Sequence, residues 1–426
     1  MIRIFEYGKT PDDEVFARGS DSANVAGIVA DIIENVKANK DKALKEYTLK
    51  FDKAKLDDLA VSDEEINEAF ASLEPEFIRV LNEAAENIRA FHSRQLRNSF
   101  VIAEKEGVVC GQRIIPIENV GIYVPGGTAP LSSTVLMDSI PAKIAGCKNI
   151  VMTTPPSADG KIDPSILAAA KIAGVDKIFK VGGAQAIAAL AYGTESIPKV
   201  DKIVGPGNAF VAEAKKQVYG MVSIDMIAGP SDILVVADGK SDVKNVAADM
   251  LSQAEHDKIA AAMLITTSEA LAKSVQEELP RQLAALPRQE IAAASLENNG
   301  AILLAEDLDT AFDLANRIAP EHLELSIADA FSHIGKVENA GACFVGHYSP
   351  EPLGDYFAGP NHVLPTSGTA RFFSPLNVED FLKKTSIVYY SREKLQESYR
   401  DIERFALAEH LDAHARSAVI RFEDEN

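Results

Sequence analysis

Apolar side chains recur at helical spacing in the first hundred residues of the chain. From Val25 to Val36 the apolar positions fall three or four residues apart, as they do along one face of a helix. Ser62 and Glu65 match the capping box that opens a helix. A third helix is expected from about Pro75, with Phe77, Leu81, Ile88 and Phe91 on one side.

The pattern changes near residue 119, where short β-like runs begin to alternate with alanine-rich helical stretches. The runs cover residues 120–124, 150–152, 178–181 and 202–204, and glycine or proline ends or closely follows each. This spacing is typical of β-α-β units and predicts a parallel sheet with helices on both faces. Ligands of such sheets bind beyond the carboxyl ends of the strands. At those ends the chain has residues 125–127, 182–183 and 205–208, which are rich in glycine.

A second α/β series follows the first. Its predicted strands are residues 233–236, 263–266, 302–304, 323–325 and 343–345. Residues 347–380 are rich in glycine, proline, serine and asparagine, and we expect a long loop there. A helical tail is predicted from about Glu393 to about Ile420. The fold class expected is therefore α/β, with two similar parallel-sheet domains and helical ends.

Composition excludes several classes of protein. With 426 residues, of which 46% are hydrophobic and 25% charged, the chain can bury a large core without disulfides. Its net charge of −20 disfavours nucleic acid and anionic membranes as partners. The cysteines, Cys110, Cys147 and Cys343, lie far apart and form neither a disulfide framework nor a thiolate zinc motif.

The start of the chain lacks the apolar core of a signal peptide, because Arg3 and Glu6 interrupt it. No apolar stretch approaches the roughly 18 residues that indicate a membrane span. We therefore expect a cytoplasmic protein with no membrane partner.

The chain has eight histidines, and two of them lie in settings that suggest chemistry. Gln253 and His256 are three residues apart, so on a helix they would share a face, where they could hold a metal. Glu321 and His322 follow Pro320, which should end a helix. Histidine is the usual general base near neutral pH. An ordinary helix-end histidine and a solvated loop pair are the alternatives.

Two further histidine settings leave the choice between site and surface open. Asp355 and His362 both fall in the predicted loop, which suggests a binding site or a solvated loop. His410 and His414 are four residues apart, the best metal-ligand spacing in the chain if both lie on one helix. Glu409 and His414, five apart, would point in different directions on such a helix. No G-x-G-x-x-G follows a predicted strand, so the residues alone leave nucleotide binding open.

Several longer segments resemble histidinol dehydrogenase, in the same order and over nearly the whole chain from about residue 20. They are residues 120–127 (VGIYVPGG), 129–137 (APLSSTVLM), 181–189 (VGGAQAIAA), 204–208 (VGPGN), 224–231 (IDMIAGPS), 251–256 (LSQAEH), 319–325 (APEHLEL), 354–356 (GDY) and 361–365 (NHVLP).

The resemblance implies NAD-dependent oxidation of L-histidinol to L-histidinal and then to L-histidine, the last steps of histidine synthesis. It also implies one zinc ion per site and an intertwined homodimer of Rossmann-like domains, with the active site shared between subunits. The domains expected are an N-terminal extension (1–17), a discontinuous catalytic domain (18–122 with 233–376), an NAD domain (123–232) and a helical tail that reaches the partner (377–426).

Site residues follow from the resemblance, motif by motif. The zinc ligands that it implies are Gln253, His256, Asp355 and, from the partner subunit, His414. Its substrate contacts are Ser231, Gln253, His256, His322, Asp355, His362, Glu409 and His414, and its NAD contacts are Tyr123, Gln185 and Asn208. His322 is then the base for both oxidations, and Glu321 activates water to attack the aldehyde. His410 has no role.

One position departs from the family pattern, because Asp232 stands where glutamate is usual after residues 229–231. The change keeps the charge and shortens the side chain, which could shift Ser231 slightly. Three other functions compete with this one: a paralogue that oxidises another alcohol such as a sulfonated diol, a zinc hydrolase that does not use NAD, and a protein without catalytic activity. The set of ligands disfavours the first, and the Glu321-His322 pair disfavours the last.

Overall fold

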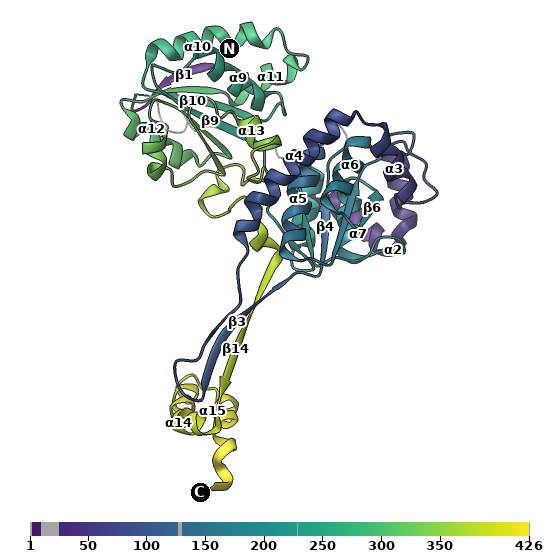
Figure 1. Cartoon of the computed structure of the whole chain (residues 1–426), viewed down its shortest axis with the longest axis vertical. Coiled ribbons are helices and arrows are strands. Elements are labelled where there is room, and N and C mark those ends of the chain that lie inside the picture. The colour runs from purple at the N-terminus through teal and green to yellow at the C-terminus, as the bar shows by residue number, and fades with distance from the viewer. Residues whose placement is uncertain (1, 10–24, 127–129, 228, 426) are drawn as a thin grey trace. The chain divides into compact units, whose positions relative to one another are not determined.

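The structure of the chain is a computed structural model that describes residues 2–9, 25–126, 130–227 and 229–425. It forms two compact units, which are taken one at a time below (Figure 1). Unit 1 comprises residues 1–95 and 117–381, and unit 2 comprises residues 96–116 and 382–426. Met1 and residues 10–17 of the predicted extension, and Gly127, Ala129 and Ala228 of the matching segments, lie outside the described residues. Among the described helices, none has the length and apolar character needed to cross a membrane.

A five-stranded parallel sheet forms one half of unit 1 and confirms the first predicted β-α-β series. In spatial order its strands are β6 (Lys177–Lys180), β5 (Asn149–Thr154), β4 (Asn119–Tyr123), β7 (Lys202–Val204) and β8 (Ser223–Ile224). The helices between them are α5 (Ser132–Ala145), α6 (Pro164–Ala173), α7 (Gly183–Tyr192) and α8 (Ala209–Val218). The order of the strands along the chain reverses between β4 and β7, and ligands of such sheets bind at this kind of position.

A six-stranded parallel sheet forms the other half of unit 1. Its strands are, in spatial order, β1 (Arg3–Glu6), β11 (Ala301–Leu304), β10 (Ala261–Thr266), β9 (Asp232–Ala237), β12 (His322–Ser326) and β13 (Ala342–Val345). The helices between them are α9 (Val243–Ala254), α10 (Glu269–Leu283), α11 (Gln289–Asn299) and α12 (Leu308–Ile318). Apart from the added edge strand β1, this sheet repeats the strand order of the first. Two similar α/β halves were predicted and are confirmed.

The N-terminal helices were expected to belong with the six-stranded half, and the structure places them elsewhere. They are α2 (Ala26–Phe51), α3 (Asp63–Ser72) and α4 (Pro75–His92). Val29 and Val36 of α2 share a core with Ile187 and Leu190 of α7, and Figure 1 shows these helices around the five-stranded sheet. The predicted grouping of 18–122 with 233–376 therefore differs from the observed packing. The reason is that an apolar helix face does not specify which of two similar sheets it covers.

Unit 2 contains a small antiparallel sheet that the sequence analysis missed. Its order is β14 (Leu382–Tyr390), β3 (Val108–Pro116) and β2 (Phe100–Ile102). The helical tail predicted over 377–426 is therefore wrong for its first part and right for α14 (Arg392–Ala408) and α15 (Asp412–Val419). The run from Ile387 to Tyr390 consists of β-branched and aromatic residues, which favour a strand. Its partner β3 lies far away along the chain, so no local pattern reveals the pairing.

The tail helix is broken at His410, which corrects the expected His410 and His414 pair. His410 has a left-handed φ of 59°, and the Leu411 N–H donates to the Ala406 carbonyl at 2.9 Å. This is the hydrogen bond of a Schellman motif, which closes α14. His410 and His414 therefore do not share one helix face.

Asp138 of α5 is completely buried, and neither carboxylate oxygen has a hydrogen-bond partner among the described residues. Burial raises the pKa of Asp138 well above its usual value, with a further contribution from Asp225. Because the folded protein then retains a proton that the unfolded chain releases near pH ~4, stability is lost as pH rises above that point. We expect Asp138→Asn, which cannot ionise, to melt a few degrees higher than the wild type at pH 8.

The measurement is the melting temperature of both proteins between pH 5 and pH 8. The difference between them should grow with pH, since only the wild type carries the ionisable group. Parallel curves for the two proteins would contradict the burial of an ionisable carboxyl at this position.

Candidate active site

Glu321 and His322 lie at the junction of α12 and β12, as predicted. Ala319 ends α12 with a left-handed φ of 51°, and Pro320 prevents the helix from continuing. Both side chains are buried, at 5% and 4% exposure. They lie at the amino end of the six-stranded sheet, the opposite end from the usual ligand site of such sheets. The rule that ligands bind beyond the carboxyl ends of parallel strands, used above for the first sheet, therefore does not locate this pair.

Asp232, at the start of the neighbouring strand β9, holds this pair in place. The Glu321 N–H donates to the Asp232 carboxylate at 2.8 Å, and the Asp232 N–H donates to the Glu321 carboxylate at 3.1 Å. The Ser231 side chain also hydrogen-bonds to Glu321. The departure from glutamate noted in the sequence therefore falls on a residue whose short side chain reaches the Glu321 backbone directly.

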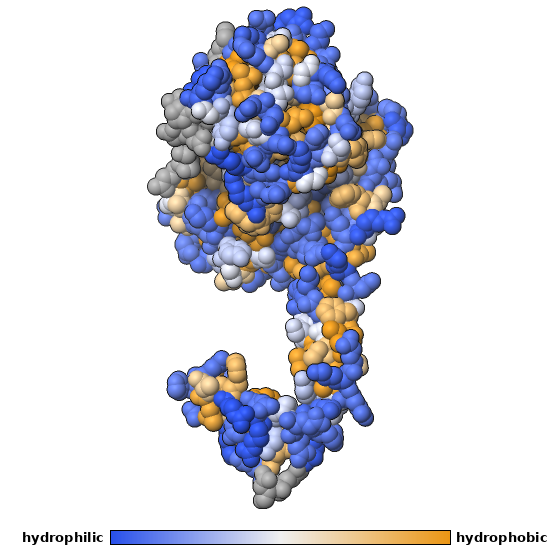
Figure 2. Space-filling view, turned by 90° about the vertical axis from the view of Figure 1, so that its left-hand side faces the viewer, coloured by the Kyte–Doolittle hydropathy of each residue, from blue (hydrophilic) through white to orange (hydrophobic). Residues whose placement is uncertain are grey.

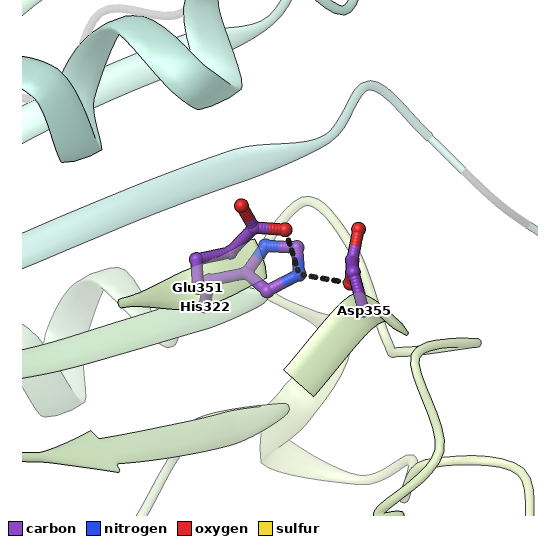
Figure 3. Close-up of side chains that lie close together, drawn as sticks. All are labelled: His322, Glu351 and Asp355. Carbon is purple, nitrogen blue, oxygen red and sulfur yellow. Dashed lines mark ion pairs between the residues drawn. The ribbon is translucent and has the colours of Figure 1, made fainter. Parts of the chain in front are cut away.

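His322 has one ring nitrogen facing the backbone and the other facing carboxylates. Its Nδ1 lies 3.1 Å from the Asp232 carbonyl oxygen, so this nitrogen carries the hydrogen and donates it. Its Nε2 lies 3.7 Å from Glu351 Oε1 and 3.9 Å from Asp355 Oδ1 (Figure 3). Nε2 is therefore the atom available for proton exchange with a substrate.

The pKa values of both residues of this pair lie above their usual values. Burial raises the pKa of Glu321 to about 7, and the charge of His322 opposes that rise. Burial lowers the pKa of His322, but the charges of Glu321, Glu351 and Asp355 outweigh it and bring the pKa to about 10. A buried acid and a buried base in contact are typical of catalytic sites.

Gln253 lies on the last turn of α9, and His256 follows the end of that helix. Gln253 is completely buried, and neither its amide oxygen nor its nitrogen has a partner among the described residues. Desolvation lowers the pKa of His256 and of His362, and the charge of Asp355 opposes that shift in both. Gln253, His256 and Asp355 thus offer an unpartnered amide oxygen, an imidazole and a carboxylate, a donor set that suits zinc.

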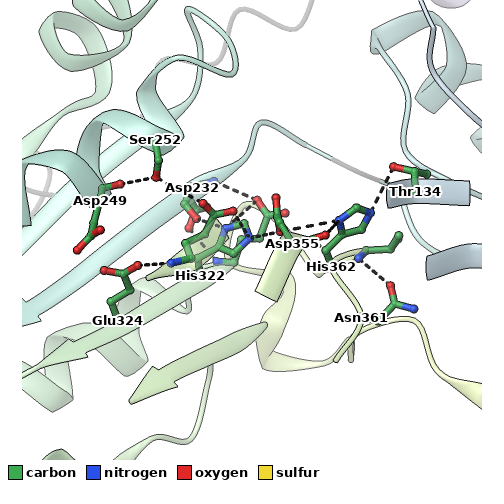
Figure 4. Close-up of polar contacts among 12 residues, drawn as sticks. Thr134, Asp232, Asp249, Ser252, His322, Glu324, Asp355, Asn361 and His362 are labelled. Carbon is green, nitrogen blue, oxygen red and sulfur yellow. Dashed lines mark hydrogen bonds and ion pairs between the residues drawn. The ribbon is translucent and has the colours of Figure 1, made fainter. Parts of the chain in front are cut away.

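His362 links the two halves of unit 1 near the site (Figure 4). Its Nδ1 lies 3.1 Å from the Asp355 carbonyl oxygen, and its Nε2 lies 3.3 Å from Thr134 Oγ1 of α5. The adjacent Asn361 donates to the Met137 carbonyl at 2.7 Å. His362 is therefore in contact with the Asp355 backbone.

The expectation of one long loop over 347–380 is wrong, because the segment contains α13 (Glu351–Tyr356) and two short 3-10 helices. Glu351 is a site residue that the sequence analysis missed. It lies one helical turn before Asp355 and is 2% exposed. Glu351 and Asp355 are four residues apart, a spacing that places two side chains on one face of a helix. The glycine and proline content of the segment indicated a loop instead, so this signal was not used.

Two further carboxyl groups, those of Glu324 and Asp249, continue from Glu351. The Glu351 N–H donates to Glu324 at 2.6 Å, and Glu324 shares a hydrogen bond with Asp249. Ser252 Oγ lies 3.4 Å from Glu351 Oε2. Burial raises the pKa of Glu351 to about 8, with the charge of Asp355 adding to it. Among the described residues, His322, Glu351 and Asp355 form a group whose ligand atoms lie within 4.8 Å of one another, close enough to hold a cation.

The three predicted NAD contacts lie around the carboxyl end of the five-stranded sheet. Tyr123 and Gln185 are buried, at 4% and 2% exposure, and the Tyr123 hydroxyl accepts a hydrogen bond from the Gly183 N–H at 3.1 Å. Asn208 is exposed and caps α8, accepting from the Phe210 and Val211 N–H groups. In the structure, Tyr123 and Asn208 thus each engage the N-terminal end of a helix.

The remaining two candidates, Glu409 and His414, belong to unit 2. Glu409 follows α14, His414 lies on α15, and both are exposed. The break at His410 lies between them, so they do not belong to one continuous helix.

Comparison with known proteins identifies the family. The family model described as histidinol dehydrogenase matches residues 17–422. The chain is 53% identical to histidinol dehydrogenase of Clostridium acetobutylicum, over 99% of both chains. It is 57% identical to that of Bacillus cereus, over 93% of this chain and 92% of the relative. A crystal structure of histidinol dehydrogenase from Elizabethkingia anophelis superposes with a TM-score of 0.94 at 42% identity, covering 99% of this chain and 98% of that one.

Proposed function

This chain belongs to the histidinol dehydrogenase family, and on that premise we propose that it oxidises L-histidinol to L-histidine through L-histidinal. Two hydride transfers to NAD would complete the reaction. The observation that carries the proposal is the buried Glu321-His322 pair, whose His322 Nε2 is directed away from the backbone toward Asp355. Asp355 is the residue that joins this pair to the predicted zinc ligands.

His322 would serve as the base in both oxidations. Its Nδ1 is fixed by the Asp232 carbonyl oxygen, so proton uptake is confined to Nε2. Hydride would leave the substrate carbon for NAD as Nε2 takes the hydroxyl proton. Glu321, with a pKa of about 7, is suited to take a proton from the water that attacks the aldehyde. Because the pair is buried, the aldehyde would stay shielded from bulk water between the two steps.

Gln253, His256 and Asp355 would hold the zinc ion together with His414 of the partner subunit. The two amide atoms of buried Gln253 have no partner in the described part of the chain, which supports this because a buried polar group normally has one. When bound, zinc would anchor the imidazole and amino groups of histidinol. Ser231 and His362 would contact the substrate on the same side. Glu409 of the partner subunit would bind its amino group.

The exposed apolar surface of unit 2 supports a dimer. Val101, Val388 and Phe405 are 61%, 71% and 70% exposed, and Figure 2 shows apolar residues on the surface. Exposed apolar clusters in a folded protein usually mark an interface. A second copy bound through unit 2 would cover them and bring Glu409 and His414 to the site of its neighbour.

Removal of the metal is expected to stop turnover. The protein should form NADH from L-histidinol and NAD, lose at least about 90% of that rate in a chelator, and regain it with Zn²⁺. The rate is followed by the absorbance of the NADH that forms. Turnover that requires zinc but not NAD would instead indicate a hydrolase, and unchanged turnover in the chelator would contradict the metal assignment.

Glu321→Gln is expected to separate the two half-reactions. Oxidation of L-histidinal needs water activated by a carboxylate, and oxidation of L-histidinol does not. We expect the rate with histidinal to fall about 10²-fold or more and the rate of the first hydride transfer to fall much less. Pre-steady-state measurement of the two NADH formed from L-histidinol, and of the one NADH formed from L-histidinal, separates the steps. Equal losses in both steps would argue that Glu321 acts only by holding His322.

A further inference from the structure

A buried ion pair lies near the carboxyl end of the five-stranded sheet. Lys215 of α8 and Asp225, which follows β8, form the pair, and their side chains are 3% and 1% exposed. Burial of this kind excludes Lys215 from direct contact with a bound phosphate. The polar partners of the pair are therefore groups of the protein itself.

The backbone N–H and the carbonyl of Gly205 both hydrogen-bond to this pair. The Gly205 N–H donates to Asp225 Oδ2 at 2.9 Å, and the Gly205 carbonyl accepts from Lys215 Nζ at 2.9 Å. Gly205 directly follows β7 and has a φ of 118°, a conformation that only glycine adopts readily. A methyl group there would collide with the Tyr123 carbonyl oxygen. The ion pair thus fixes the point at which β7 approaches the end of β4.

This point is the place where the strand order reverses, between β4 and β7. The chain runs from Gly205 to Asn208, which caps α8, so the orientation of Gly205 sets the start of that helix. On the other side, Tyr123 ends β4 and accepts from the N–H of Gly183. The backbone near Gly205 therefore connects two helix N-termini, the features that receive dinucleotide phosphates in such folds.

We infer that Lys215 and Asp225 are positioning residues for NAD: the pair holds the 205–208 segment in the shape that the cofactor requires, and it acts on NAD binding and not on histidinol binding. The inference rests on the NAD-binding part of the proposed function. A buried ion pair contributes little net stability compared with apolar side chains of similar size. A geometric role accounts for its presence better than a stabilising one.

The test compares Lys215→Met, the double variant Lys215→Met/Asp225→Asn, and a control. The double variant leaves no unpaired charge from this pair, so it should fold even if the single variant does not. Lys143→Met is the control, because Lys143 of α5 pairs with Asp176 at 2.9 Å at the opposite end of the sheet. KM for NAD should rise about tenfold or more in the folded Lys215 variants. In these variants, KM for histidinol and zinc content should stay within about twofold of wild type. In the Lys143→Met control, KM for NAD should also stay within about twofold.

Unchanged KM for NAD in a folded variant, or an equal rise in both KM values, would overturn the inference. The proposed function fails separately, in the wild type, if no NADH forms from histidinol. Calorimetric titration of NAD into the wild type and the double variant then decides the inference without turnover. A weaker affinity in the variant supports it, and equal affinities or no binding to either protein overturn it.

Discussion

Replacing His322 with alanine is expected to lower the rate of both oxidation steps by about 10²- to 10⁴-fold. The reason is that Nε2 of His322 is the only ring atom left for proton transfer once the Asp232 carbonyl has engaged Nδ1. Loss of the base should affect the alcohol and the aldehyde steps alike. Rates of NADH formation measured separately with L-histidinol and L-histidinal check this.

His347→Ala provides the matched control. His347 is exposed, and its Nδ1 lies 3.1 Å from Ser326 Oγ, at the opposite end of β12 from His322. Its replacement should leave both rates within about twofold of wild type. Near-normal histidinol turnover in His322→Ala would contradict the assignment of the base.

Mixing two inactive variants is expected to restore activity. If His414 serves the partner's site, a dimer of one His322→Ala and one His414→Ala subunit has one intact site. After unfolding and refolding together, an equal mixture should recover about a quarter of wild-type activity, because half of the dimers are mixed and each has one site of two. Activity is measured before and after exchange of subunits.

Each variant refolded alone is the control and should stay inactive. Recovery that needs both variants would demonstrate a site shared between subunits. Absence of recovery, with mixed dimers confirmed by mass, would show that His414 acts within its own chain.

The sequence alone predicted much of the architecture, because its strongest signals are local. Every predicted strand is present, since β-branched runs bounded by glycine and proline specify strands without reference to distant residues. The Glu321-His322 junction was found for the same reason, through Pro320. The roles of Gln253, His256 and Asp355, by contrast, came from resemblance to a family.

The features missed depend on contacts between distant segments or on competing local signals. Pairing of β14 with β3 joins segments far apart in the chain, and the packing of α2 depends on a choice between two similar sheets. Glu351 went unnoticed because glycine and proline in its neighbourhood indicated a loop. His410 was expected on a helix, and only its left-handed backbone revealed the break.

The measurement that tests the central claim most directly is the amount of NADH formed per L-histidinol consumed, with the product identified. The proposed function predicts two NADH per histidinol, with L-histidine as the sole product. One NADH per histidinol with release of L-histidinal, or no NADH at all, would contradict a two-step oxidation at this site.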